Sequence, residues 1–179
     1  KEKSDEIIIN ANRDISNYED FGYKVVSDKF DGYKGPLAGL HSAIDLYKNS
    51  KEDLWFALFP TDAPIINTGI IDNFISITEK KNKVYICKIN NIIEPMFSFW
   101  SSKIFVNLNE VLLKNNGYKI MKFAEENGYN FINFQKKKKI EFFNVNDKDD
   151  YKELLSTGKA SHCKDCQKHN AKPRLDFAR

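Results

Sequence analysis

An apolar run in this sequence ends abruptly in an acidic turn bracketed by prolines, and this limits the folds that the chain can adopt. Residues 54–59 read L-W-F-A-L-F, and residues 60–64 continue with P-T-D-A-P. Apolar residues that do not alternate with polar ones are typical of a parallel strand covered on both faces. The run therefore predicts a buried strand of an α/β sheet, with Asp62 at its carboxyl end.

Asp62 is the first candidate for a functional side chain. Ligands of such sheets bind beyond the carboxyl ends of the strands. A carboxylate in that place is a short, hard oxygen ligand that can hold Mg2+ against substrate phosphates. The alternative is structural, because an aspartate just before Pro64 also forms an Asx turn that caps the next helix. The motif alone leaves both interpretations open.

Length and charge predict one folded domain with a separate end segment. The chain has 179 residues, of which 41% are hydrophobic, and this suffices for one domain with a core. Basic residues outnumber acidic ones in residues 156–179, whereas the rest of the chain is close to neutral. We therefore expect a domain over residues 1–155 and a basic tail over residues 156–179.

The same features bear on partners and location. A near-neutral body differs from a nucleic-acid-binding domain, in which positive charge follows a recognition face, so we expect no nucleic-acid partner. The sequence has no apolar run of about 18 residues and no signal peptide, which predicts a cytoplasmic protein without a membrane partner. The tail motif His162, Cys163, Cys166 and His169 is weak, because adjacent His162 and Cys163 are hard to direct at one tetrahedral ion. We expect no zinc site there.

Polar residues follow the first two predicted strands. Residues 5–10 form an apolar strand that leads into Asn10, Asn12 and Arg13, and residues 23–26 form a second strand that leads to Asp28. Amides and a guanidinium at a strand exit can read a purine edge and hold phosphate oxygens. Asparagines are also ordinary turn residues, so a structural interpretation stays open.

A glycine-bracketed segment, G-P-L-A-G at residues 35–39, begins a predicted helix. Pro36 suits the first helical position, and apolar residues recur from there at helical spacing. Glycines at a helix N-terminus let a ligand approach the backbone N–H groups, which makes a candidate binding segment of Gly35, Pro36, Leu37, Ala38 and Gly39. His41 falls on the polar side of this helix, where we expect it to be at the surface.

The rest of the chain continues the alternation of strands and helices. Pro95 lies within a predicted strand and therefore implies an edge strand or a bulge. Asn144 and Asn146 follow the last predicted strand as candidate ligands for a polar molecule, or as helix-entry residues, and Asp147 with Asp150 resembles a capping box. The predicted elements are helices at 69–78, 101–113, 118–126 and 148–155, and strands at 83–89, 92–100, 131–134 and 140–145.

Four segments, in this order, carry a family resemblance. They are I-I-I-N-A-N-R at residues 7–13, Y-K-G-P-L-A-G-L at 33–40, F-P-T-D-A-P at 59–64 and F-N-V-N-D at 143–147. Together they resemble the molybdenum cofactor guanylyltransferases of the nucleotidyltransferase superfamily, over residues 5–155. The resemblance implies a Rossmann-like nucleotidyltransferase fold, a three-layer α/β structure with a mostly parallel central sheet.

The resemblance also implies an activity and its residues. Such enzymes transfer GMP from GTP to molybdopterin with Mg2+, release pyrophosphate, and have molybdoenzymes or other cofactor-biosynthesis proteins as further partners. By this resemblance Asn10 and Asp28 contact guanosine, and Asp62 holds Mg2+ and meets the nucleotide. Asn144 and Asn146 bind the pterin substrate, and the segment at residues 35–39 borders the nucleotide site.

One family signature has no counterpart in these residues. The family begins with a strand and the loop L-A-G-G-x-S-x-R-M-G-x-D-K, and the present 179 residues contain no such segment. We therefore expect the first strand and the phosphate loop to be missing, and this polypeptide by itself to be an inactive fragment. Two alternatives stay open: another nucleotidyltransferase, acting on cytidine nucleotides or sugar phosphates, and a nucleotide- or partner-binding module without catalysis.

Overall fold

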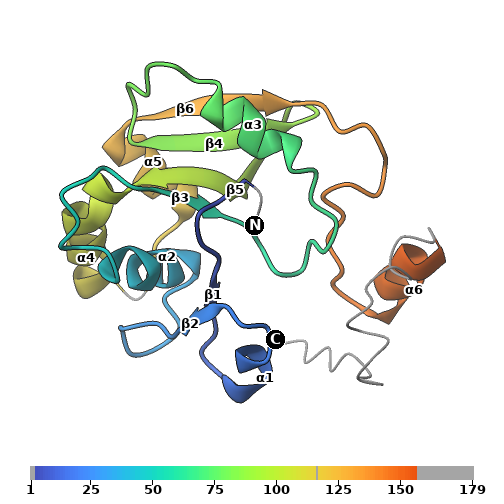
Figure 1. Ribbon diagram of the computed structural model, residues 1–179, viewed down its shortest axis with the longest axis horizontal. Coiled ribbons are helices and arrows are strands. Elements are labelled where there is room, and N and C mark those ends of the chain that lie inside the picture. The colour runs from blue at the N-terminus through green and yellow to red at the C-terminus, as the bar shows by residue number, and fades with distance from the viewer. Residues whose placement is uncertain (1–2, 116, 157–179) are drawn as a thin grey trace. The chain divides into compact units, whose positions relative to one another are not determined.

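The structure is a computed structural model that describes residues 3–115 and 117–156 (Figure 1). The basic tail and its His162, Cys163, Cys166 and His169 motif lie outside the described residues. The chain divides into two compact units, which are described separately below. Among the described residues, the first unit comprises residues 3–59, 68–115 and 117–135, and the second comprises residues 60–67 and 136–156.

Strands and helices alternate along most of the chain. In order, the elements are β1 (Ile8–Asn10), α1 (Ser16–Glu19), β2 (Lys24–Val26), α2 (Pro36–Asp45), β3 (Trp55–Leu58), α3 (Gly69–Ile75), β4 (Val84–Ile89), β5 (Ile92–Ser101), η1 (Ser102–Ile104), α4 (Phe105–Lys114), α5 (Ile120–Asn127), β6 (Tyr129–Phe134) and α6 (Lys148–Ser156). No helix among the described residues is long and apolar enough to cross a membrane.

The main sheet has four strands in the order β3-β5-β4-β6. Strand β5 is antiparallel to both β3 and β4, whereas β4 and β6 are parallel. Strands β3, β4 and β6 therefore run in one direction and β5 opposes them. The predicted α/β fold class, with a sheet whose strands mostly share one direction, is confirmed.

The strand at residues 54–59 was predicted to be parallel to its neighbours and buried on both faces, and both parts of this prediction were wrong. Its described neighbour, β5, is antiparallel, and β3 is only half-buried because it lies at an edge of the four-stranded sheet. The strand covered on both faces is β4, which pairs along both edges and is buried at five of its six residues. An apolar run indicates that a strand contacts a hydrophobic core, but it does not distinguish a central strand from one at the edge of a sheet.

Strands β1 and β2 form a separate parallel pair, with Ile9 opposite Val25. Helix α2 contacts β1, β2 and β3, so it links the small sheet to the main one within the first unit (Figure 1).

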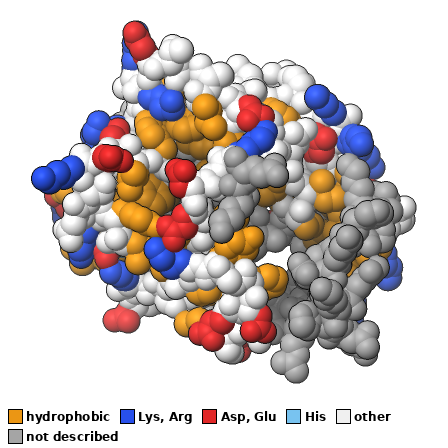
Figure 2. Space-filling model, in the orientation of Figure 1, with side chains coloured by type: hydrophobic (Ala, Val, Ile, Leu, Met, Phe, Trp, Pro, Cys, Tyr) orange, Lys and Arg blue, Asp and Glu red, His pale blue; other side chains and the backbone are white. Residues whose placement is uncertain are grey.

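Helices cover both faces of the main sheet and complete three layers. On one face Trp100 and Ile86 pack with residues of α2, α4 and α5 in a single buried cluster. On the other face Phe74 of α3 stacks on Phe99 at 4.2 Å between ring centroids. Successive strand residues point to opposite faces of a sheet, so Phe99 and Trp100 pack against helices on opposite sides. Outside this core, lysine and acidic side chains are interspersed with hydrophobic ones on the face shown in Figure 2.

The bulge predicted at Pro95 is confirmed. The pairing of β4 with β5 jumps from Ile86 opposite Ser98 to Cys87 opposite Glu94. The Ser98 hydroxyl donates to the Pro95 carbonyl at 2.8 Å, which holds the bulged backbone. Strand β3 pairs with β5 only from Ser98 to Ser101, so Pro95 lies at a bulge beyond this pairing, where β4 is the only neighbour of β5 among the described strands.

In the second unit, the strand predicted at residues 140–145 was wrong. This segment is a turn followed by irregular backbone, and Phe142 has a φ of 58°. A positive φ in a bulky residue interrupts the extended conformation that a strand requires. The N–H groups of Phe142 and Val145 instead bond the carbonyls of Ile65 and Asp62, at 2.8 and 2.7 Å.

The helix start predicted after this segment is confirmed. The Asp147 carboxylate accepts bonds from the backbone N–H groups of Asp149 and Asp150 at the start of α6. The Asp150 carboxylate in turn accepts from the N–H of Asn146 at 2.9 Å. The bonds to Asp147 satisfy two N–H groups that have no partner within the helix, and the bond to Asp150 fixes the residue that precedes Asp147.

Candidate functional site

In the first unit, a network of side chains joins the carboxyl ends of β1 and β2. The Asn10 amide donates to the Asp28 Oδ1 at 3.0 Å, and the Asn12 amide donates to the Asp28 Oδ2 at 2.8 Å. The Asn12 Oδ1 also accepts from the Asp28 backbone N–H at 2.8 Å. Two residues predicted to contact guanosine, Asn10 and Asp28, are therefore brought into direct contact.

Gly39 lies against the Asn10 side chain of this network, and its lack of a side chain makes that close approach possible. A Cβ atom at this position would lie 2.7 Å from the Cγ of Asn10 and closer still to its Oδ1. Only glycine leaves room for the Asn10 side chain against helix α2. The G-P-L-A-G segment and the exit of β1 are thus fitted to each other, although they lie about thirty residues apart in the sequence.

The other members of this segment have different surroundings. Pro36 occupies the first turn of α2, after Gly35, whose φ is 77°. The side chains of Leu37 and Ala38 are fully buried in the main core. Any contact of these two residues with a ligand must therefore involve the backbone, while their side chains anchor the start of the helix.

Lysines that flank α2 in the sequence are engaged in structural contacts. Lys29 and Lys48 both pair with Asp45 on α2, and the hydrogen bond from Lys29 is the main reason that the pKa of Asp45 is lowered. The Lys34 ammonium donates to the carbonyls of Leu112 and Asn115 at 2.5 and 3.1 Å. It thereby satisfies carbonyls at the C-terminal end of α4, which attracts cations.

The surface position expected for His41 was wrong, since only 3% of the residue is exposed. Its ring lies between Phe30 and Phe105, each at 4.9 Å between centroids, and its Nε2 is 3.2 Å from the Asn109 Oδ1. The Nδ1 atom has no hydrogen-bond partner within the described residues. Burial lowers the pKa of His41, because the charged imidazolium is poorly solvated there. Helix α4 packs on the side of α2 that the sequence marked as polar.

In the second unit, Asp62 and the two late asparagines lie on adjacent segments. The Asp62 carbonyl accepts the bond from the Val145 N–H at 2.7 Å, and Val145 is buried between Asn144 and Asn146. The side chains of Asp62, Asn144 and Asn146 are exposed. The structure therefore brings the predicted metal ligand beside the residues predicted to bind the pterin.

The capping alternative for Asp62 does not match the structure. Its carboxylate makes no hydrogen bond or ion pair with the described residues of its own unit, 60–67 and 136–156, and α3 begins at Gly69 after Thr68. Within these residues no group of three His, Cys, Asp or Glu side chains could hold a metal ion. A lone exposed carboxylate still fits Mg2+, which binds one or two protein carboxylates and completes its shell with phosphates and water.

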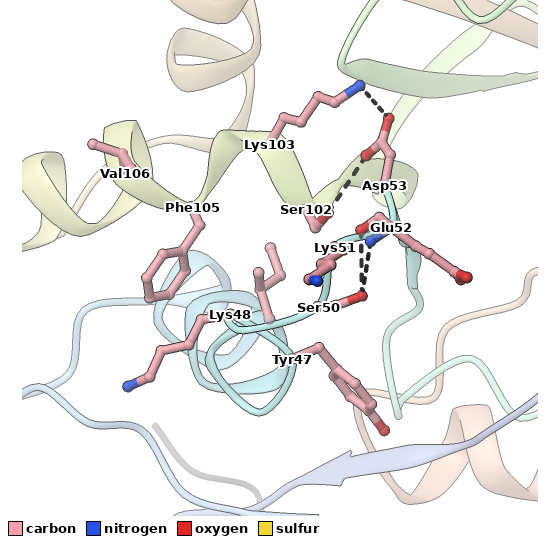
Figure 3. A pocket seen from close by; sticks show the side chains of 11 residues that line it. Tyr47, Lys48, Ser50, Lys51, Glu52, Asp53, Ser102, Lys103, Phe105 and Val106 are labelled. Atoms are coloured by element: carbon pink, nitrogen blue, oxygen red, sulfur yellow. Dashed lines mark hydrogen bonds and ion pairs between the residues drawn. The ribbon is translucent and has the colours of Figure 1, made fainter.

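A further pocket of the first unit was not anticipated from the sequence. It has a volume of about 300 Å³ and lies beside η1 and the end of α2 (Figure 3). Lys103 pairs with Asp53 at 2.9 Å across one side of it, and Ser101 donates to the same carboxylate. Partial burial opposes ionisation of Asp53, but these bonds outweigh it and lower the pKa. The pocket is lined by Ile44, Tyr47, Lys48, Ser50, Lys51, Glu52, Asp53, Ser102, Lys103, Phe105 and Val106.

Among known proteins, molybdenum cofactor guanylyltransferases are similar in sequence to this chain. A molybdenum cofactor guanylyltransferase from Vibrio atlanticus (strain LGP32) is 30% identical over 120 residues, covering 67% of this chain and 59% of the relative. One from Shewanella sediminis (strain HAW-EB3) is 38% identical over 77 residues, covering 43% of this chain and 37% of the relative. The chain thus spans less than two thirds of the length of these curated relatives.

Solved structures agree on the fold. Molybdopterin-guanine dinucleotide biosynthesis protein A from Archaeoglobus fulgidus superposes with a TM-score of 0.62 at 19% identity, covering 84% of this chain and 78% of that one. A protein from Aquifex aeolicus VF5 gives the same TM-score at 20% identity, covering 80% and 72%. The model of the MobA-like NTP transferase domain matches residues 2–128, which include β1, β2, α2 and β3, and the chain belongs to this family.

Proposed function

We propose that this chain is part of a molybdenum cofactor guanylyltransferase, which transfers GMP from GTP to molybdopterin and releases pyrophosphate. The observation that carries the proposal is the contact of Asn10 with Asp28 at the exits of β1 and β2, against Gly39 of α2, in a member of this family. A cytoplasmic location, and molybdoenzymes or other cofactor-biosynthesis proteins as further partners, belong to the same proposal.

The nucleoside end of GTP is assigned to the network in the first unit. Asn10 offers an amide and Asp28 a carboxylate at the same strand exits, and Gly39 leaves the space that brings Asn10 against α2. A hydrogen bond to a carboxylate is stronger than one between neutral groups, so Asp28 is suited to select a base that presents donors.

The phosphate end is assigned to Asp62. Its exposed carboxylate, without a partner among the described residues of the second unit, can bind Mg2+ together with the phosphates of the nucleotide. Bound there, Mg2+ would offset negative charge as the α-phosphorus is attacked. The hydrogen bond between the Asp62 carbonyl and Val145 holds the backbone that presents this carboxylate.

The acceptor end is assigned to Asn144 and Asn146, whose exposed amides can bond a polar heterocycle. In the reaction an oxygen of the terminal phosphate of molybdopterin forms a bond to the α-phosphorus of GTP. The bond from that phosphorus to the bridging oxygen of the β-phosphate breaks, and pyrophosphate leaves with the electron pair. No protein nucleophile is required, so the residues act by binding and orienting the two substrates.

The test is turnover in the presence of GTP, Mg2+ and molybdopterin, with the dinucleotide product detected by mass spectrometry. Two polypeptides are compared: residues 1–179, and the same residues joined upstream to a strand, glycine-rich loop and helix of the family type. We expect product from the joined polypeptide and none from residues 1–179 alone. CTP in place of GTP should give no product. Product from CTP but not from GTP would assign a different nucleotide, and guanosine binding without product from either polypeptide would favour a non-catalytic module.

A further inference from the structure

Asn12 makes the most complete set of contacts with Asp28, yet the family resemblance assigned it no role. Its side-chain amide donates to the Asp28 Oδ2 at 2.8 Å, and its side-chain oxygen accepts from the Asp28 backbone N–H at 2.8 Å. Both polar atoms of one side chain are therefore used on a single residue of the neighbouring strand exit. An asparagine in an ordinary turn bonds its own local backbone instead.

Asn10 alone would not fix the same carboxylate. Its amide is shared between the Asp28 Oδ1 at 3.0 Å and the Val26 carbonyl at 3.3 Å. Rotation of an aspartate carboxylate about its last torsion is broad and weakly restrained. A second donor on the other oxygen, which Asn12 supplies, removes that freedom.

The two amides occupy one acceptor position on each carboxylate oxygen. An ionised carboxylate has about four such positions in all, so each Asp28 oxygen retains capacity for one more donor. Two adjacent acceptors in a fixed plane are complementary to a planar edge that carries two adjacent donors. Guanine presents such an edge in its N1–H and 2-amino groups, whereas hypoxanthine has the N1–H alone.

We propose that Asn12 is a positioning residue that holds the Asp28 carboxylate in the orientation that selects guanine. The inference rests on the proposed function, because it requires that Asp28 contact the base. It goes beyond that function by assigning base discrimination to a residue that does not itself touch the nucleotide. The contact between Asn12 and the Asp28 backbone also keeps the exits of β1 and β2 together.

The experiment measures dissociation constants of guanosine and inosine, which differ only in the 2-amino group, for the full chain. The variants are Asn12→Ala and Asn12→Asp; the second retains an acceptor for the Asp28 N–H but replaces the donor to the carboxylate by a second negative charge. The matched control is Ser27→Ala, which removes a bond at the same strand exits, from the Ser27 hydroxyl to the Ala11 carbonyl at 2.8 Å. Melting temperatures report whether each variant is folded.

Unmodified protein and Ser27→Ala should bind guanosine at least about tenfold more tightly than inosine, as expected for one added hydrogen bond to a charged group. Both Asn12 variants should reduce this preference to less than about threefold, and in Asn12→Ala the inosine affinity should change little. A folded Asn12 variant that keeps the full preference would overturn the inference and leave the proposed function intact. Failure of the unmodified chain to bind guanosine would overturn the nucleoside assignment and the inference with it.

Discussion

Replacement of Gly39 by alanine separates a role in binding from a role in folding. The added Cβ would lie 2.7 Å from the Cγ of Asn10, so the Asn10 side chain must move. Because Asn10 is exposed, it can rotate away from the helix and lose its hydrogen bond to Asp28. That loss costs about 1 kcal/mol in the free energy of unfolding. Alanine in a helix interior is favoured over glycine by about 1 kcal/mol, which offsets it.

Gly39→Ala should therefore change the free energy of unfolding by less than about 1 kcal/mol, measured by urea denaturation. Affinity for guanosine should nevertheless fall by about tenfold or more, because Asn10 no longer occupies its position beside Asp28. Ala43→Gly on the same helix measures how much the difference in helix propensity between alanine and glycine contributes to the free energy of unfolding. It should lose about 1 kcal/mol of stability without a change in guanosine affinity.

The expected clash between the added Cβ and the Asn10 side chain can be tested directly in an Asn10→Ala variant. When Asn10→Ala has already removed the obstructing side chain, Gly39→Ala should stabilise the protein by about 1 kcal/mol. If Gly39→Ala is equally stabilising with Asn10 present, the close contact does not exist in solution and the reasoning is refuted.

Three further predictions concern the remaining residues. In a complete enzyme, Asp62→Asn should leave the melting temperature nearly unchanged and lower Mg2+-dependent turnover by about 100-fold or more, whereas unchanged turnover would remove Asp62 from the metal site. Replacing Asn144 and Asn146 by alanine together should raise the KM for molybdopterin more than that for GTP, and equal effects on both would indicate a structural role. The free energy of unfolding should fall as the pH drops below about 6.5, since the unfolded chain protonates His41 more readily than the folded chain, in which its pKa is lowered. Urea denaturation of His41→Phe across the same pH range should show a smaller loss, and an identical loss would assign the pH dependence to other groups.

Features that depend on neighbours a few residues away could be predicted from the sequence. Pro36 after Gly35 marked the start of α2, Asp147 marked the start of α6, and Pro95 marked the bulge in β5. Each depends on a local backbone property: the fixed φ and missing N–H of proline, or a side chain that bonds the nearest free N–H groups. Such properties are the same wherever the segment lies in the fold, so the pattern is sufficient to predict them.

Which side chains meet, and which are covered, could not be predicted in this way, because it depends on contacts between distant parts of the chain. His41 is buried because Phe105 and Asn109, more than sixty residues later, pack on its helix, and β4 rather than β3 is the covered strand because β5 and β6 pair with it. The contact between Asn12 and Asp28 likewise depends on the register of β1 against β2, which neither strand specifies alone. Burial and pairing are set by residues distant in the sequence, and for this reason local patterns identified the candidate residues but not the contacts among them.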